Sequence, residues 1–262
     1  MMDDEKAEYW LPFPHDDLAL RCAVLHQQRR KLQDEKLEVE VLSARKALSE
    51  IFLKGKGIEV GAGSRPFPLP DGVECYYGDV LDSASLEKYF GTDKVVLDGV
   101  IDAQTMRGIP HDSLDFVISA HVIEHLHDPI GAIRATINVL KQGGVFLLVV
   151  PEMTKTWDRR RPPTTLDHLI KDSRDGGYST HLEAAIEHAR YVHPEITGKT
   201  IPEDEIISDA QNLIDSGMDM HMHAWRMVDF REMLDHIAND AKFAVEAALS
   251  RVNENAFVLR RL

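Results

Sequence analysis

The residues best suited to bind a ligand are the glycines of Gly61-Ala62-Gly63, which follow the short apolar stretch Gly57-Ile58-Glu59-Val60. Glycine permits positive φ angles and lets the backbone approach a ligand without a Cβ in the way. Open α/β sheets bind ligands at such turns, beyond the carboxyl end of a parallel strand. Pro66 replaces the third glycine of the pyrophosphate fingerprint, and Glu59 adds a carboxylate. The sequence therefore predicts a site for a nucleotide-like ligand that carries positive charge.

A second group of candidate residues centres on His221 and His223, which are two positions apart. In an extended segment, side chains at this spacing point to the same side. Such a pair can bind a metal ion, hold a substrate hydroxyl or act as a base, because imidazole titrates near neutrality. His168 and Asp158 are candidates for a further metal ligand. Ordinary loop histidines remain the alternative interpretation.

Arg161 closes the basic run Arg159-Arg160-Arg161 and offers a planar fork for a carboxylate or phosphate on a substrate. If a proton must be removed from an attacking hydroxyl or amine, we expect His223 to be the base. His221 and His168 are the next candidates.

Strands and helices are predicted to alternate from residue 57 onward, as in a parallel α/β sheet. Strands are expected at 57–60, 74–77, 95–102, 114–120, 145–150, 243–249 and 256–262. Between the first two strands, three prolines at 66, 68 and 70 oppose a regular helix, so the first crossover helix is expected to be missing.

Two helices are predicted from apolar periodicity. The first covers about 17–54, is rich in charge, and would pack on the domain or on a partner subunit, which suggests a homodimer. The second is expected to end at Gly143-Gly144. The apolar residues of the two faces are Leu37, Val41, Ala44, Leu48 and Ile51, and then Ile130, Ile133, Ile137 and Leu140.

Two stretches, EVGAGSRPFPLPDGVECYYGDV and SLDFVISAHVIEHLHDPIGAIRATINVLKQGGVFLLVVPE, resemble the class I S-adenosylmethionine-dependent methyltransferases, particularly the type 11 group. The sulfonium and ammonium of S-adenosylmethionine suit the charge of Glu59. The resemblance implies an α/β, Rossmann-like fold with a mostly parallel seven-stranded sheet. It also implies an N-terminal helical extension, and a helical insert after the fifth strand. A nicotinamide-dependent oxidoreductase is disfavoured by the missing third glycine.

The resemblance also implies roles in cofactor binding. Gly61 and Gly63 match the turn under the methionyl and ribose portions, and Glu59 matches the residue that fixes this loop and the amino group. Arg65 is a candidate partner for the cofactor carboxylate. The remaining matches are Asp79 for the ribose hydroxyls, with Asp82 as a competitor, Asp102 and Ala103 for the adenine, and Ser119 and His121 beside the sulfonium.

The segments TWDRRRPPTTLDHLIKD and HMHAW resemble an uncharacterised bacterial branch of this group that is associated with glycan or surface-polymer genes. The matched residues are Asp158, Arg161, Thr164, His168, Asp172, His221, His223 and Trp225. We therefore expect three parts: an N-terminal extension at 1–54, a methyltransferase domain at 55–153 and 223–262, and a substrate-binding insert or lid at 154–222.

The function implied by the resemblance is methyl transfer to an oxygen or nitrogen of a small molecule, sugar or polymer building block. Methylation of a peptide or natural-product carboxylate is an alternative, as is a non-catalytic subunit that binds the cofactor. The charge of −14 disfavours nucleic acid as a partner. Cys22 and Cys75 form no pair with metal or redox spacing, and neither a signal peptide nor a membrane span is expected, which fits a cytoplasmic protein.

Overall fold

The computed structural model describes residues 15–262. The chain divides into two compact units, Met1–Ser43 and Ala44–Leu262, and helix α2 (His15–Phe52) contributes residues to both. The first ten residues, on which the absence of a signal peptide was predicted, lie outside the described part. Among the described residues, no helix is long and apolar enough to cross a membrane.

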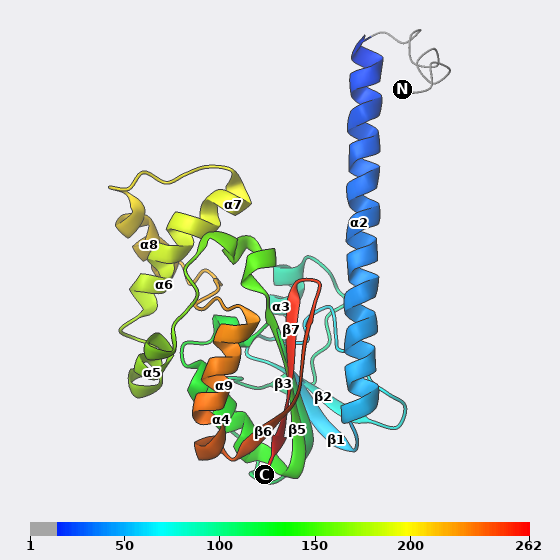
Figure 1. Cartoon of the computed structure of the whole chain (residues 1–262), viewed down its shortest axis with the longest axis vertical. Coiled ribbons are helices and arrows are strands. Elements are labelled where there is room, and N and C mark those ends of the chain that lie inside the picture. Colours follow the sequence, from blue (N-terminus) through cyan, green and yellow to red (C-terminus); the bar gives the residue numbers. More distant parts are fainter. Residues whose placement is uncertain (1–14) are drawn as a thin grey trace. The chain divides into compact units, whose positions relative to one another are not determined.

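The second unit is built around one seven-stranded sheet with the strand order β3-β2-β1-β4-β5-β7-β6 (Figure 1). The first five strands pair in parallel, and β7 is antiparallel to both of its neighbours. The strands are β1 (Lys56–Val60), β2 (Glu74–Asp79), β3 (Gly99–Val100), β4 (Leu114–Ala120), β5 (Leu140–Pro151), β6 (Phe243–Arg251) and β7 (Glu254–Arg261). This mixed, mostly parallel sheet confirms the predicted fold class.

Hydrophobic side chains cover both faces of this sheet, because successive residues of β5 point to opposite sides. Phe146 and Leu148 belong to the core formed with α4 (Pro129–Val139) and α9 (Met227–Ala241). Leu147 faces the other core, to which the last turn of α2 contributes Leu48. The uninterrupted apolar sequence of β5 is thus explained by burial on both faces.

Short helices fill the chain between β5 and α9, as the sequence predicts for an insert there. They are η2 (Met153–Lys155), η3 (Trp157–Arg160), α5 (Leu166–Asp175), α6 (His181–Glu187), the π-helical η4 (His188–Val192), α7 (His193–Thr197) and α8 (Ile206–Asp215). Earlier in the chain lie α3 (Ser83–Phe90) and the 3-10 turn η1 (Ile123–His125). The domain boundaries at 54, 153 and 222 stay a prediction.

Residues 61–73 form turns and irregular structure and contain no helix, which confirms that the first crossover helix is missing. The predicted lengths of one strand and one helix were wrong. The third strand covers only Gly99–Val100, because Val96 N–H donates to Gly63 O and ties the preceding residues to the glycine turn. The second predicted helix ends at Val139, and Leu140 is already paired with Leu114 in the sheet.

The apolar stripe predicted along α2 is not buried throughout. Leu48 is buried, whereas 63% of the Ile51 surface and 45% of the Leu37 surface are exposed. Within the second unit, the end of the helix buries Leu48 and Leu53 against the sheet, so Ile51 falls on the solvent side.

Candidate active site

The glycine turn lies directly after β1, where the backbone requires glycine. Gly61 and Gly63 have φ angles of 71° and 54°, in the left-handed region. A Cβ on Gly61 would lie 2.3 Å from the Val122 side chain, so the turn also packs too closely for any other residue. Val60 pairs with Ser119, which places the turn next to the end of β4.

Glu59 holds the chain that follows this turn. Its buried carboxylate accepts hydrogen bonds from Phe67 N–H at 3.0 Å to each oxygen. Burial raises the pKa of Glu59 to about 7, against the lowering effects of Phe67 N–H and Arg45. A cationic ligand near this carboxylate would favour its ionised form. Arg65, in the same loop, is exposed.

Three acidic residues predicted near the cofactor lie at the end of β2, after it and after β3. Asp79 is half-buried, and burial raises its pKa. Asp82, considered as its competitor, is the N-cap of α3 and accepts from Ser85 N–H at 2.8 Å. Asp102 accepts from Gln104 N–H at 2.9 Å and from Thr105 Oγ1 at 2.7 Å, and the next residue, Ala103, packs against the core. Asp79 Oδ1 likewise accepts from Leu81 N–H at 3.0 Å, and Asp79, not Asp82, is the residue that ends β2 at the ligand-binding edge of the sheet.

The end of β4 presents His121 in a strained conformation. Ser119 is buried in the strand, and His121 has a φ angle of 57°, which non-glycine residues adopt at a cost. His121 Nε2 lies 2.7 Å from Glu254 Oε1, and Arg45 donates to the same carboxylate. Burial lowers the pKa of His121, but Glu124 and Glu254 outweigh it and raise the pKa to about 9.

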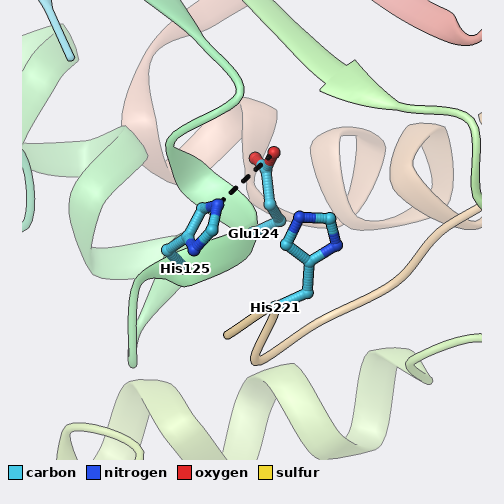
Figure 2. Close-up of side chains that lie close together, drawn as sticks. All are labelled: Glu124, His125 and His221. Atoms are coloured by element: carbon cyan, nitrogen blue, oxygen red, sulfur yellow. Dashed lines mark ion pairs between the residues drawn. The ribbon is translucent and has the colours of Figure 1, made fainter. Parts of the chain in front are cut away.

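Glu124, His125 and His221, which we call the outer cluster, come together beside His121 (Figure 2). Only 1% of Glu124 is exposed, and neither of its carboxylate oxygens has a hydrogen-bond partner. The carboxylate lies 4.0 Å from His125 Nε2 and 3.5 Å from His121 Nδ1. About a quarter of each imidazole of His125 and His221 is exposed, so the cluster can be reached from solvent.

Carboxylates outside the cluster hold its two imidazoles. His125 Nδ1 lies 2.6 Å from Asp219 Oδ1, and His221 Nδ1 lies 2.6 Å from Asp158 Oδ2. Because an ionised carboxylate only accepts, each Nδ1 carries the proton and donates. The Nε2 atoms of both rings are left for Glu124 or a ligand.

Arg161 does not offer its guanidinium to a substrate. Its side chain is 1% exposed and bonds to Asp158, Glu187 and the backbone carbonyls of His221 and Met222. The predicted fork is thus occupied within the protein. Arg161 and Asp158 instead form a chain of contacts that fixes His221. Burial would raise the pKa of Asp158, but His221 and Arg161 outweigh it and lower the pKa.

His223 lies in a second group, His168, Asp172 and His223, which we call the buried cluster. Only 1% of His223 is exposed, and burial lowers its pKa to about 3. Its ring stacks on Trp225 with centroids 5.4 Å apart and an interplanar angle of 22°. The sequence-based pairing of His221 with His223 was therefore wrong: the two imidazoles belong to different clusters. The burial of His223 also argues against its predicted role as base.

Thr164, another of the residues matched to that branch, holds the backbone of the insert through its bonds to Ala224. Thr164 N–H donates to Ala224 O at 2.8 Å, and Ala224 N–H donates to Thr164 Oγ1 at 3.0 Å. These bonds fasten the end of the insert to its beginning. Three residues of the site were missed from sequence: Glu124, Asp219 and Glu254. Glu124 adjoins His125 within the resemblance segment IEHLHDP, which was the one available signal.

The strand order and the ligand-binding edge define a Rossmann-like methyltransferase. The sequence profile described as "Methyltransferase domain" matches residues 24–256. The chain therefore belongs to the methyltransferase domain family and is an S-adenosylmethionine-dependent methyltransferase. No curated protein sequence matches it significantly.

Solved structures of methyltransferases also align with the chain at low identity. A methyltransferase from Thermotoga maritima, described as a possible histamine N-methyltransferase, is 14% identical with a TM-score of 0.49, over 91% of this chain and 96% of that one. One from Aquifex aeolicus is 13% identical with a TM-score of 0.47, over 90% and 98% of the two chains. The family assignment rests on the profile match.

The residues present fit S-adenosylmethionine. Its ribose hydroxyls would find Asp79 at the end of β2, and its amino group would find the buried carboxylate of Glu59 near the glycine turn. The turn itself packs tightly through Gly61, and Ser119 lies in the adjacent strand. The outer cluster begins at Glu124, shortly after β4 ends at Ala120.

Proposed function

We propose that this methyltransferase acts on an oxygen or nitrogen of a small molecule, sugar or polymer building block, and that the outer cluster holds the attacking group. The observation that carries this proposal is the buried carboxylate of Glu124, which makes no hydrogen bond and has three imidazoles around it. Val122, next to His121, contacts the glycine turn, so this polar group adjoins the cofactor edge.

The cofactor supplies an electrophilic methyl group when bound. The acceptor lone pair forms a bond to the methyl carbon while the carbon–sulfur bond breaks, and sulfur keeps the electron pair. The chain's own contribution is to align the acceptor, exclude water and receive the acceptor proton. The outer cluster suits the last task because its imidazoles are held by Asp158 and Asp219 with one nitrogen each left available.

The class of acceptor is supported by what the site offers. Imidazoles and carboxylates hydrogen-bond hydroxyl and amine groups well. A peptide or natural-product carboxylate was considered as an acceptor because Arg161 could bind it. Arg161 is bonded to protein groups instead, so this alternative is disfavoured. The charge of −14 disfavours nucleic acid, and the glycan-associated resemblance supports a sugar or polymer building block. We assign the insert at 154–222 to acceptor binding.

The first test is calorimetric titration of the full chain with S-adenosylmethionine, S-adenosylhomocysteine and NAD. We expect micromolar binding of the first two and none of NAD. Binding of NAD alone would contradict the proposal.

The second test follows transfer of a labelled methyl group to panels of sugars, amines, hydroxy compounds and peptide carboxylates. Label on a hydroxyl or amine supports the proposal, whereas label only on carboxylates contradicts it. Cofactor binding with no transfer to any panel would favour a non-catalytic subunit.

A further inference from the structure

The outer cluster has the composition and geometry of a metal site. One candidate ligand atom from each of Glu124, His125 and His221 lies within 4.8 Å of the other two. The Glu124 carboxylate is 1% exposed and makes no hydrogen bond. Its charge is balanced by ion pairs as long as 3.5 Å to His121 Nδ1 and 4.0 Å to His125 Nε2, so a buried carboxylate remains that a cation can bind directly.

The orientation of the two imidazoles also supports a metal site. Ligating histidines usually donate their second ring N–H to a carboxylate, which fixes the ring and raises its basicity. His125 and His221 both do so, through Asp219 and Asp158. His125 Nε2 is therefore left on the side of Glu124, and Figure 2 shows the free nitrogen of His221 turned to the same carboxylate.

We infer that Glu124, His125 and His221 bind a divalent first-row transition-metal cation, such as Zn²⁺ or Mn²⁺. Two imidazoles and one carboxylate form a ligand set that leaves coordination positions open, as in catalytic rather than structural metal sites. The exposed quarter of His125 and of His221 lets an outside oxygen reach the metal. His121 Nδ1, 3.5 Å from Glu124, lines the same space.

A bound cation would also specify which acceptor atom is methylated. This part of the inference rests on the proposed function. A hydroxyl oxygen of the acceptor would bind the metal beside the cofactor edge. With both imidazoles bound to it, the metal takes over their part in activating the acceptor: it lowers the pKa of that hydroxyl, and the proton passes to solvent water before the oxygen attacks the methyl carbon. The preferred acceptor is then an oxygen nucleophile, and one with a neighbouring hydroxyl can chelate the metal.

The buried cluster is the natural comparison for this proposal. His168, Asp172 and His223 also gather three ligand atoms. However, His223 is 1% exposed, and neither of its ring nitrogens makes a hydrogen bond of normal geometry. Among the described residues, the carboxylate paired with that ring is Asp172, 3.7 Å from Nε2 and itself a member of the cluster, so it cannot also orient the ring from outside. We therefore assign the cation to the outer cluster and use His168 as the control position.

The experiment is metal titration of the chelator-treated full chain without cofactor or acceptor, using Co²⁺ followed by visible absorption and Zn²⁺ followed by calorimetry. We expect one equivalent to bind. Glu124→Gln and His221→Asn each remove a ligand and should weaken binding by at least about 100-fold. Asp219→Asn removes only the group that orients His125 and should weaken it by about 10- to 100-fold. His168→Asn should change the affinity by less than about twofold. Circular dichroism confirms that each variant is folded.

Three outcomes overturn the metal site: no saturable binding by the wild-type chain, unchanged binding by both Glu124→Gln and His221→Asn, or loss of binding in His168→Asn. These readouts contain no methyl transfer, so they are independent of the proposed function. Metal binding without methylation of any acceptor would leave the site intact and contradict the function. Full turnover after metal removal, verified by elemental analysis, would overturn the metal's part in catalysis.

Discussion

The outer and buried clusters each contain two histidines and one acidic residue, and they share the segment that carries His221 and His223, but their surroundings differ. Each imidazole of the outer cluster has one nitrogen held by a carboxylate and is partly exposed. His223 is enclosed, stacks on Trp225 and has its pKa lowered to about 3 by burial. The same side chain thus acts as a polar group in one cluster and as a neutral aromatic ring in the other.

This difference shows that exposure and hydrogen bonding decide which histidine can do chemistry. A base or ligand needs a defined tautomer and a free nitrogen that outside molecules can reach. His221 has both, because Asp158 fixes its Nδ1 and Arg161 in turn holds Asp158. His223 has neither, so its contribution belongs to the stability of the fold.

The largest expected effect is on turnover. His221→Asn should lower kcat/KM for methyl transfer by at least about 100-fold, because it removes a group that contacts the acceptor or its metal. Thermal stability should change little, since His221 is partly exposed. The matched control is His236→Asn on the exposed face of α9. Activity within threefold of wild type for His221→Asn would contradict the proposal that the outer cluster holds the acceptor.

The second effect is on stability. His223→Ala should lower the free energy of unfolding by about 2–4 kcal/mol, because it leaves a cavity beside Trp225. His223→Phe keeps an aromatic ring in that place and should cost less than about 1.5 kcal/mol. Urea unfolding monitored by tryptophan fluorescence measures both. If the two variants lose equal stability, His223 contributes a polar interaction rather than packing.

The third effect is the pH dependence of that stability. The pKa of His223 in the fold is about 3, below the ordinary value of 6.5. The unfolded chain therefore takes up a proton below pH 6.5 that the folded chain does not, and the contribution is lost as the pH falls towards 3. From this residue, we expect about 2 kcal/mol less stability at pH 5 than at pH 7.

His223→Phe provides the control for this dependence. Urea unfolding at pH 7 and pH 5 measures how much stability each protein loses between the two pH values. We expect the loss to be about 2 kcal/mol smaller for the variant than for wild type. An identical pH dependence for wild type and variant would show that His223 is not the residue responsible.

The smallest effect is expected at His168, on the partly exposed side of the buried cluster. His168→Asn removes an ion pair with Asp172 at 3.3 Å and should cost about 1 kcal/mol of stability. Methyl transfer should stay within about twofold of wild type, as measured by kcat/KM on the same acceptor. A loss comparable with that of His221→Asn would mean that both clusters take part in catalysis.

The sequence predicted the edge of the sheet better than the insert, for a physical reason. β1 and β4 are short apolar runs that end at glycine or polar residues, so local pattern alone marks their carboxyl ends. The missing helix after β1 was equally local, because proline opposes helix wherever it stands. The contacts of the insert depend instead on residues far apart in the sequence, such as Arg161 and His221.

The error about His221 and His223 came from applying strand periodicity to a segment that is not a strand. Residues 218–226 have no regular structure, with a bend at Met222. The N–H groups of Met222 and His223 both donate to Glu124 O, at 2.8 and 3.1 Å. These bonds turn the chain and send the two imidazoles to different clusters. Glu124 itself could not be distinguished from sequence, because its role depends on burial.

The left-handed backbone of His121 has a consequence for anyone who engineers this protein. Glycine would relieve the steric cost of the positive φ angle, but His121→Gly would also remove the imidazole that pairs with the buried carboxylates of Glu124 and Glu254. That variant would lose the link that this imidazole makes between Glu254 and Glu124 of the outer cluster. Directed evolution for robustness should therefore leave position 121 unchanged, or select for turnover at the same time.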